Sequence, residues 1–238
     1  MELVFPLFLA GMVALVVIGV LLDRRRQRAL QAWARANGWT YEAARADLIH
    51  LQRGFPFGQG RRRTATEVLR GSYDALPALS FRYRWTTGTG KSRTEHSVHV
   101  VAVPMPAFLA TLEVTPEGVG ARLAKAFGAQ DIQFESEDFN RAFRIAAGDL
   151  AFAHAVLAPR LMEYLLRPDA ARSPWRIEGP WIVSWETGGT NTAVLGRRLA
   201  QLAAVVRAIP RHVWQDHGYD PHDSAVGTYP PPRPGLTH

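Results

Sequence analysis

The sequence predicts an α+β protein in which an N-terminal transmembrane helix precedes one mainly antiparallel sheet domain with helices on one face. Three observations lead to this fold class. The run Leu3–Leu22 is continuously apolar, an apolar period of two begins at Thr66, and an apolar period near 3.6 marks Thr192–Ala208. The order of the elements also allows a barrel like that of pleckstrin-homology domains.

Composition and charge narrow the class of protein. The 238 residues are 47% hydrophobic and 21% charged, without cysteine, which excludes a disordered chain, a disulfide scaffold, thiolate metal sites and cysteine-based catalysis. Residues 23–70 hold 11 Lys and Arg against 4 Asp and Glu, whereas residues 71–238 hold 17 against 16. Because the excess charge directly follows the apolar run, it indicates a membrane surface, and no nucleic acid partner is expected.

The apolar run Leu3–Leu22 is interpreted as an uncleaved anchor. It has 20 residues without a charged or hydrogen-bonding side chain, and at about 1.5 Å per residue it spans the roughly 30 Å core of a bilayer. A secretory signal peptide needs a basic start and small residues at a cleavage site. Here Glu2 is the only early charge and Val20-Leu21-Leu22 precedes Asp23, so an anchor is the better interpretation.

Four arginines directly after the anchor predict its orientation. Because Lys and Arg are retained on the cytoplasmic side, the protein is expected in the cell membrane as a single-pass chain, N-out and C-in. We expect the same arginines to bind anionic lipid at the membrane surface, at about 1 kcal/mol each before screening. The alternative is that they only set topology. They are Arg24, Arg25, Arg26 and Arg28.

Three units follow along the chain. Residues 1–37 are the anchor with a basic juxtamembrane helix, whose end is predicted at Gly38. Residues 38–209 are the soluble α+β domain, and residues 210–238 are a flexible Pro-rich tail. Trp33 and Trp39 are expected either at the lipid headgroups or packed on the domain, the second being commoner.

The first half of the domain is predicted to be mainly strands. A strand from Thr66 ends in a turn at Asp74–Pro77, and Phe81, Tyr83 and Trp85 then alternate with arginines. The further elements expected are short segments at 39–41 and 47–51, a loop at 55–63, strands at 96–104, 112–115 and 132–134, and a helix at 119–127.

The second half is predicted to contain helices and one hairpin. Ser136 and Asp149 are the expected N-caps of two helices, and Pro159 suits the first turn of a third. A hairpin is predicted around Gly179-Pro180, with strands Trp175–Glu178 and Trp181–Glu186. Thr192–Ala208 is an amphipathic helix, with Arg197, Arg198 and Gln201 off its apolar stripe.

The block F-E-S-E-D-F-N-R-A-F-R-I at 134–145, with the helices and hairpin that follow it, resembles a family of bacterial, mainly actinobacterial, proteins. These have one N-terminal transmembrane helix and a soluble domain carrying F-E-S-E-x-F-N-R-x-F-R-[VI]. The similarity extends over nearly the whole chain, including Phe55-Pro56-Phe57-Gly58 and His212-Val213-Trp214. It implies membership and supplies no activity, cofactor or catalytic residue.

Histidines are the first candidates for metal or acid–base chemistry. His96 and His99 are three apart in a predicted strand, so they point to opposite faces and do not share a metal. A second group lies after the last helix and lacks a metalloenzyme spacing, so no metal or other cofactor is predicted. Its members are His212, Asp216, His217, His222 and Asp223.

Acidic residues offer the one candidate for an active site. Glu135, Glu137 and Asp138 crowd one segment, and paired carboxylates perform acid–base chemistry when their environments separate their pKa values. A helix start balanced by Arg141 and Arg144 is the commoner explanation. Motifs of nucleophilic catalysis and of phosphate loops are missing from the sequence.

The sequence therefore predicts a membrane-anchored, non-enzymatic adaptor or binding module with a cytoplasmic domain and no assigned catalytic residue. Its expected partners are the lipid bilayer, including anionic lipid, and a cytoplasmic protein. The alternative is a membrane-tethered enzyme with an acidic site near Glu135 to Arg144.

Overall fold

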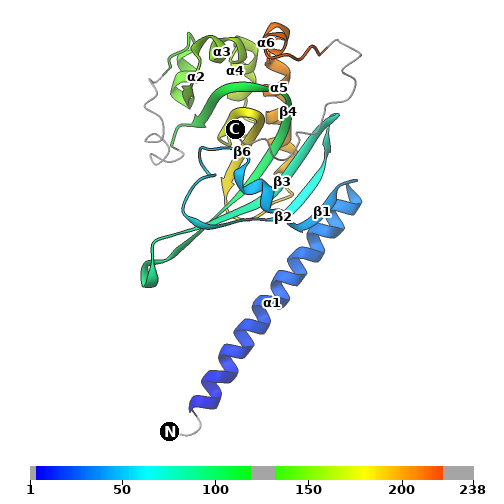
Figure 1. The fold of residues 1–238 in the computed structure, drawn as a ribbon, viewed down its shortest axis with the longest axis vertical. Coiled ribbons are helices and arrows are strands. Elements are labelled where there is room, and N and C mark those ends of the chain that lie inside the picture. The colour runs from blue at the N-terminus through cyan, green and yellow to red at the C-terminus, as the bar shows by residue number, and fades with distance from the viewer. Residues whose placement is uncertain (1–3, 119–131, 222–238) are drawn as a thin grey trace.

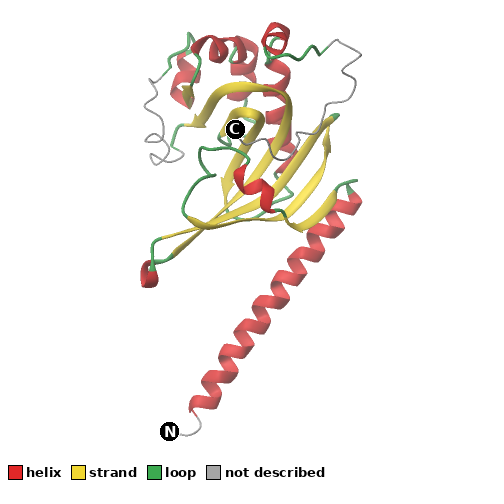
Figure 2. Ribbon diagram, viewed as in Figure 1, coloured by secondary structure: helices red, strands yellow, loops and turns green. Residues whose placement is uncertain are grey.

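The computed structural model describes residues 4–118 and 132–221, without the side chains of 4–8, 10 and 91. The fold is α+β: an N-terminal helix is followed by an antiparallel sheet that carries further helices (Figures 1 and 2). The helices are α1 (Val4–Ala36), α2 (Glu137–Ala142), α3 (Leu150–Val156), α4 (Pro159–Leu166), α5 (Leu195–Ala208) and α6 (Arg211–Asp216), with the 3-10 turns η1 (Ala46–His50) and η2 (Gly90–Ser92). The strands are β1 (Thr40–Ala44), β2 (Arg61–Tyr73), β3 (Leu76–Thr87), β4 (Thr94–Pro116), β5 (Phe143–Ala147) and β6 (Trp175–Thr187).

Helix α1 is one continuous helix of 33 residues that projects from the domain (Figure 1). It ends before Gly38, whose φ of +70° suits glycine, as predicted. Its C-terminal turns pack on the sheet through the buried Leu30 and Ala34. Trp33 and Trp39 meet edge to face at 5.7 Å, and both pack against the domain core, so the packed alternative for this pair is confirmed.

Among the residues and side chains that the structure describes, no helix combines the length and apolar character needed to cross a membrane. The predicted span Leu3–Leu22 begins outside the described residues and includes several side chains that are not described.

The sheet is antiparallel throughout, with the order β1-β2-β3-β4-β5 and β6 also paired with β4. The β2–β3 hairpin turns at Asp74 and Ala75, both with positive φ, as a tight hairpin turn requires. No pairing among the described strands joins β1 to β5 or β6, so the sheet is open and the pleckstrin-homology-like barrel is not confirmed.

Strands β4 and β6 correct two predictions. The predicted strands 96–104 and 112–115 are parts of the single bent strand β4. The predicted hairpin around Gly179-Pro180 is wrong, because β6 runs through these residues and pairs with β4 on both sides of them. The register shifts between Pro104 and Leu112, where Gly179 has a φ of +61°. The glycine and prolines therefore bend two paired strands instead of ending them.

The two faces of the sheet carry different cores. One core lies under α5 and extends to α1 and the smaller helices. The other is aromatic and lies between the sheet and segment 46–60, around Phe57, Phe81, Tyr83 and Trp85. Helix α5 thus covers one face, as predicted, while a loop with one 3-10 turn covers the other.

The helical end of the domain confirms several local predictions. Ser136 and Asp149 cap α2 and α3 by accepting hydrogen bonds from Phe139 N and Phe152 N, and Pro159 starts α4. No strand forms at 132–134, and the predicted helix at 119–127 lies outside the described residues.

The first residues of the predicted tail are helical. Residues 211–216 form α6, which buries Val213 and Trp214. The domain therefore extends past residue 209, because two large apolar side chains reach the core. The Pro-rich stretch beyond residue 221 lies outside the described residues.

Candidate functional site

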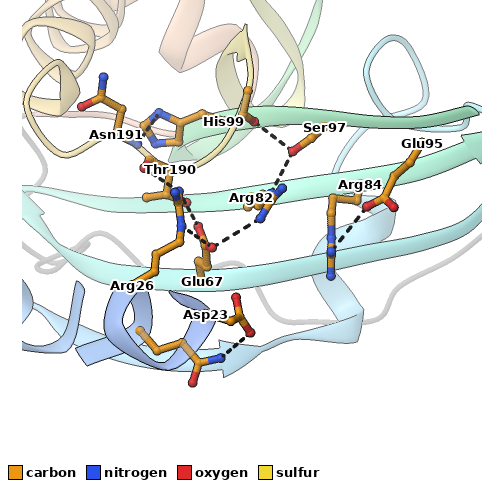
Figure 3. Close-up of polar contacts among 12 residues, drawn as sticks. Asp23, Arg26, Glu67, Arg82, Arg84, Glu95, Ser97, His99, Thr190 and Asn191 are labelled. Atoms are coloured by element: carbon orange, nitrogen blue, oxygen red, sulfur yellow. Dashed lines mark hydrogen bonds and ion pairs between the residues drawn. The ribbon is translucent and has the colours of Figure 1, made fainter. Parts of the chain in front are cut away.

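The junction between α1 and the sheet is built around an ion pair between a half-buried arginine and a buried carboxylate. Arg26 of α1 donates to both carboxylate oxygens of Glu67 on β2, at 2.7 and 3.1 Å, and to the carbonyl of Thr190 at 2.9 Å (Figure 3). Glu67 is 5% exposed. A Cβ at Gly189 would lie 2.6 Å from the Arg26 guanidinium, so glycine there leaves room for this contact.

Backbone irregularity aims Glu67 at the junction. The β2–β3 register shifts between Thr66 and Leu69, and Glu67 has a φ of +54°. A bulge of this kind re-aims a side chain to the other face of a sheet. The carboxylate therefore meets Arg26 on the α5 face.

A second cation joins the cluster from β3. Arg82 Nη1 lies 3.6 Å from the Glu67 carboxylate, and Arg82 Nε donates to Ser97 Oγ at 2.9 Å (Figure 3). Burial raises the pKa of Glu67, but hydrogen bonding to Arg26 and the charges of Arg26 and Arg82 outweigh it and hold that pKa below its usual value. The junction is thus an ionised carboxylate clamped between two arginines.

His99 lies next to the junction and is neutral. Its Nδ1 accepts a hydrogen bond from Arg198 Nη1 at 3.1 Å, because a guanidinium only donates. Its Nε2, 2.7 Å from Ser80 Oγ, therefore carries the proton and donates. Burial, followed by the charges of Arg198 and Arg26, lowers the pKa of His99 to about 3. This histidine is a fixed hydrogen-bonding group of the core and does not titrate near neutral pH.

Arg198 of α5 is 1% exposed and faces neutral acceptors. It donates to Ser184 Oγ at 3.1 Å and to the His99 carbonyl at 3.2 Å. Burial lowers its pKa to about 10, with Glu186 acting in the opposite direction, so Arg198 stays charged at neutral pH. The sequence placed Arg198 and Gln201 off the apolar stripe of the helix, but both are buried because α5 lies between the sheet and the segment before β6.

A shallow depression of about 220 Å³ lies beside Arg198, lined by charged, polar and small apolar side chains of β6, of α5 with its N-cap residue, and of the segment before β6. Ser173 donates to Glu186 within it, and the Arg198 guanidinium is engaged with His99 and Ser184. Ser173 is 2% exposed, so this hydroxyl–carboxylate pair is closed off inside the fold and serves as a structural contact. Its lining is Ala170, Ala171, Arg172, Ser173, Glu186, Val194, Arg197 and Arg198.

The four predicted membrane-surface arginines separate into two groups. Arg24, Arg25 and Arg28 are exposed on α1. Arg26 is half-buried and engaged with Glu67 and Thr190, a contact that the sequence did not predict. The signal for it is weak, because a single acid on a strand 41 residues away has no pattern linking it to the helix.

The acidic segment does not form a pocket. Glu135, Glu137 and Asp138 are exposed around the start of α2, and Asp138 pairs with Arg141. Asn140 ties the segment together through hydrogen bonds to the backbone N–H and C=O of Phe134. The described geometry is that of a capped helix start, so the concave acid pair that the enzymatic alternative requires is not formed.

The histidine candidates are not assembled into a metal centre within the described residues. His96 stacks on Trp85 at 5.1 Å, while His99 is buried on the opposite face. His212, Asp216 and His217 belong to or adjoin α6. His222 and Asp223 lie outside the described part of the chain.

Comparison with known proteins gives a likeness in fold. No protein-family model matches the chain, and a search of curated proteins finds no significant match. The crystal structure of the mycobacterial trehalose monomycolate transport factor A, TtfA, aligns with a TM-score of 0.55 at 15% sequence identity, covering 77% of this chain and 96% of that chain. The two proteins are similar in fold, and the family predicted from the 134–145 block stays a prediction.

Proposed function

We propose that the protein is a membrane-anchored, non-enzymatic adaptor of a transport process, with α1 in the bilayer, the N-terminus outside and the domain in the cytoplasm. One observation carries the proposal. The N-terminal half of α1 is apolar and exposed, whereas its C-terminal half is fixed on the domain. Large side chains of the first half are about half exposed or more, up to 72% for Leu15. They are Leu9, Met12, Val13, Leu15, Val16, Val17, Ile18, Val20, Leu21 and Leu22.

A continuous apolar surface of this kind is costly in water and is buried by a lipid core. The exposed Arg24, Arg25 and Arg28 follow it directly, at the position where basic side chains meet anionic headgroups on the cytoplasmic side. The Arg26–Glu67 ion pair and the packing of Leu30 and Ala34 then fix the domain to the helix. The helix therefore serves as a rigid stalk that sets the orientation of the domain at the membrane.

A role in transport draws on the likeness in fold to a trehalose monomycolate transport factor. The acidic segment that the enzymatic alternative needs is an exposed, capped helix start with Asp138 paired to Arg141, which favours the adaptor over that alternative. The partner expected for such a factor is a cytoplasmic or membrane protein of the transport machinery.

Topology is tested by cysteine labelling, because the chain has no cysteine of its own. Ser92→Cys places a thiol on the exposed tip of the β3–β4 hairpin. We expect a membrane-impermeant maleimide to label it only after lysis, with a periplasmic single-cysteine protein as the positive control. Labelling in intact cells would put the domain outside and contradict the orientation.

The adaptor role is tested by crosslinking and purification of the full chain from membranes. The matched control replaces Leu3–Leu22 with an unrelated transmembrane span, which keeps the domain at the membrane. We expect the same partner with both chains. Recovery of the protein alone in repeated experiments would contradict the adaptor role, and loss of the partner from the control would assign the contact to the span.

A further inference from the structure

The β3–β4 hairpin ends in a small basic surface. Its tip, residues 88–93, contains Lys91 and the exposed Arg93. Arg61 pairs with Thr86 beside the tip, so the exposed Arg61 and Arg62 lie at its base. We call the three residues Arg61, Arg62 and Arg93 the basic tip.

Carboxylates do not balance this charge. Residues 52–66 contain no Asp or Glu, and Glu95 is the one acidic residue in 74–112 apart from Asp74 itself. Glu95 lies 3.4 Å from Arg84, which already engages it (Figure 3). Arg61, Arg62 and Arg93 have no ion pair among the described residues. The basic tip therefore presents positive charge to an external partner.

The tip also has a particular direction. Figure 1 shows the hairpin projecting from the domain on the side toward which the N-terminal half of α1 runs, while α2, α3, α4 and α6 gather at the opposite end. A domain held by α1 above a bilayer thus directs this hairpin, and not its helical end, toward the membrane.

We propose that the basic tip is a second membrane contact that binds anionic lipid headgroups, separate from the arginines of α1. This inference rests on the proposed function, because it requires α1 in the bilayer. Gly, Thr and Ser supply the rest of the tip, so the contact lies at the headgroups and does not reach the acyl chains. Two points of attachment, the stalk and the tip, restrain rotation and tilt of the domain over the membrane.

The experiment uses the full chain reconstituted into vesicles of phosphatidylcholine, with or without phosphatidylglycerol. Co-flotation that resists alkaline carbonate first reports whether α1 is inserted. A fluorophore at Ser92→Cys then reports contact through quenching by nitroxide lipids, labelled at the headgroup or near the acyl-chain end. Glu163→Cys on α4, exposed at the helical end, gives the background.

We expect strong headgroup quenching at position 92 only with phosphatidylglycerol. At about fivefold per arginine near an anionic surface, Arg61→Gln with Arg62→Gln lowers the ratio of bound to free tips about 25-fold. The matched pair Arg160→Gln with Arg197→Gln, exposed elsewhere, leaves it unchanged.

Three results overturn the inference while leaving insertion of α1 intact. Quenching at position 92 could be no stronger than at position 163, it could be equal in both lipid mixtures, or it could come mainly from nitroxides near the acyl-chain end. Failure of the chain to float after carbonate treatment overturns the proposed anchor itself, and with it this inference.

Discussion

Within the described part of the chain, each face of the sheet has one fully buried arginine against it, and the two charges are balanced in different ways. On the face covered by segment 46–60, Arg176 lies 3.2 Å from the carboxylates of Glu113 and Glu178. On the α5 face, Arg198 bonds to Ser184, the His99 carbonyl and His99 Nδ1, and no carboxylate is within ion-pair distance among the described residues.

These surroundings show what each arginine does for the fold. Arg176 joins β6 to β4 and also bonds to Gln52 at 3.1 Å, while a Cβ at Gly54 would overlap its guanidinium. It joins the two strands through opposite charge and holds the covering segment through the neutral side-chain amide of Gln52. Arg198 fastens α5 to the sheet through neutral acceptors, and its uncompensated charge helps to keep His99 neutral. Burial of a charged group is thus structural on both faces.

The largest effect is expected at Arg176. Arg176→Met leaves two largely buried carboxylates without their partner, and breaking a buried pair from one side costs about 3–5 kcal/mol of unfolding free energy. Glu113→Gln is the matched control, because Glu178 still pairs with the arginine, and its cost should be smaller. Urea unfolding of the full chain in detergent micelles measures both. A loss below about 1 kcal/mol for Arg176→Met would show that the pair behaves as a solvated surface pair.

A smaller effect is expected at Arg198. Arg198→Met removes the arginine donor from Ser184 Oγ and from the His99 carbonyl, at about 1–3 kcal/mol for a buried unsatisfied group. His99 Nδ1 keeps only the longer bond from Asn191 N at 3.4 Å, and no opposite charge is stranded. The pKa of His99 should rise from about 3 and stay below its ordinary 6.5, because burial is the largest cause of its depression.

Urea unfolding and an NMR titration of the ring, assigned with His99→Gln, measure these two effects. An unchanged His99 titration would remove Arg198 from the causes of its neutrality. If Arg198→Met lowered the free energy of unfolding more than Arg176→Met does, the arginine with neutral acceptors would be the more important of the two for stability.

Local patterns predicted the parts of the fold that neighbouring residues determine. The helix end at Gly38, the caps at Ser136 and Asp149 and the start of α4 at Pro159 depend on a few adjacent residues. The joined strands β4 and β6 were missed, because a Gly-Pro pair that marks a turn in isolation becomes a bend when a partner strand runs beside it.

The junction was predictable only in part. The run of arginines after the apolar segment was visible, and three of its four members are exposed, while their contact with a membrane surface stays a prediction. The partner of Arg26 was not, since Glu67 reaches it through a bulge that no sequence pattern marks. The sequence pattern placed Arg198 on the polar side of α5, because helical periodicity identifies only one apolar face. In the structure, packing buries this helix from two sides.

The smallest expected effect concerns the pH dependence of stability, which should have opposite signs for the buried carboxylates on the two faces. Burial is the largest influence on both Glu67 and Glu113, but the arginines around Glu67 outweigh it and lower the pKa, whereas burial prevails at Glu113 and raises it. A lowered pKa contributes stability that is present above the unfolded value near 4.5 and is lost as the pH falls through the folded pKa. A raised pKa contributes stability that is present below the unfolded value and is lost as the pH rises through the folded pKa.

The two carboxylates should therefore respond oppositely when they are neutralised one at a time. As the pH falls, the stability of the native chain relative to Glu113→Gln should increase through the window above 4.5, and its stability relative to Glu67→Gln should decrease below that value. Urea unfolding of the three chains between about pH 7 and pH 3 measures both differences. An increase relative to Glu67→Gln as the pH falls would mean that Glu67 is not clamped by Arg26 and Arg82 in solution. The contacts left to hold α1 on the domain would then be the Arg26–Thr190 hydrogen bond and the packing of its C-terminal turns.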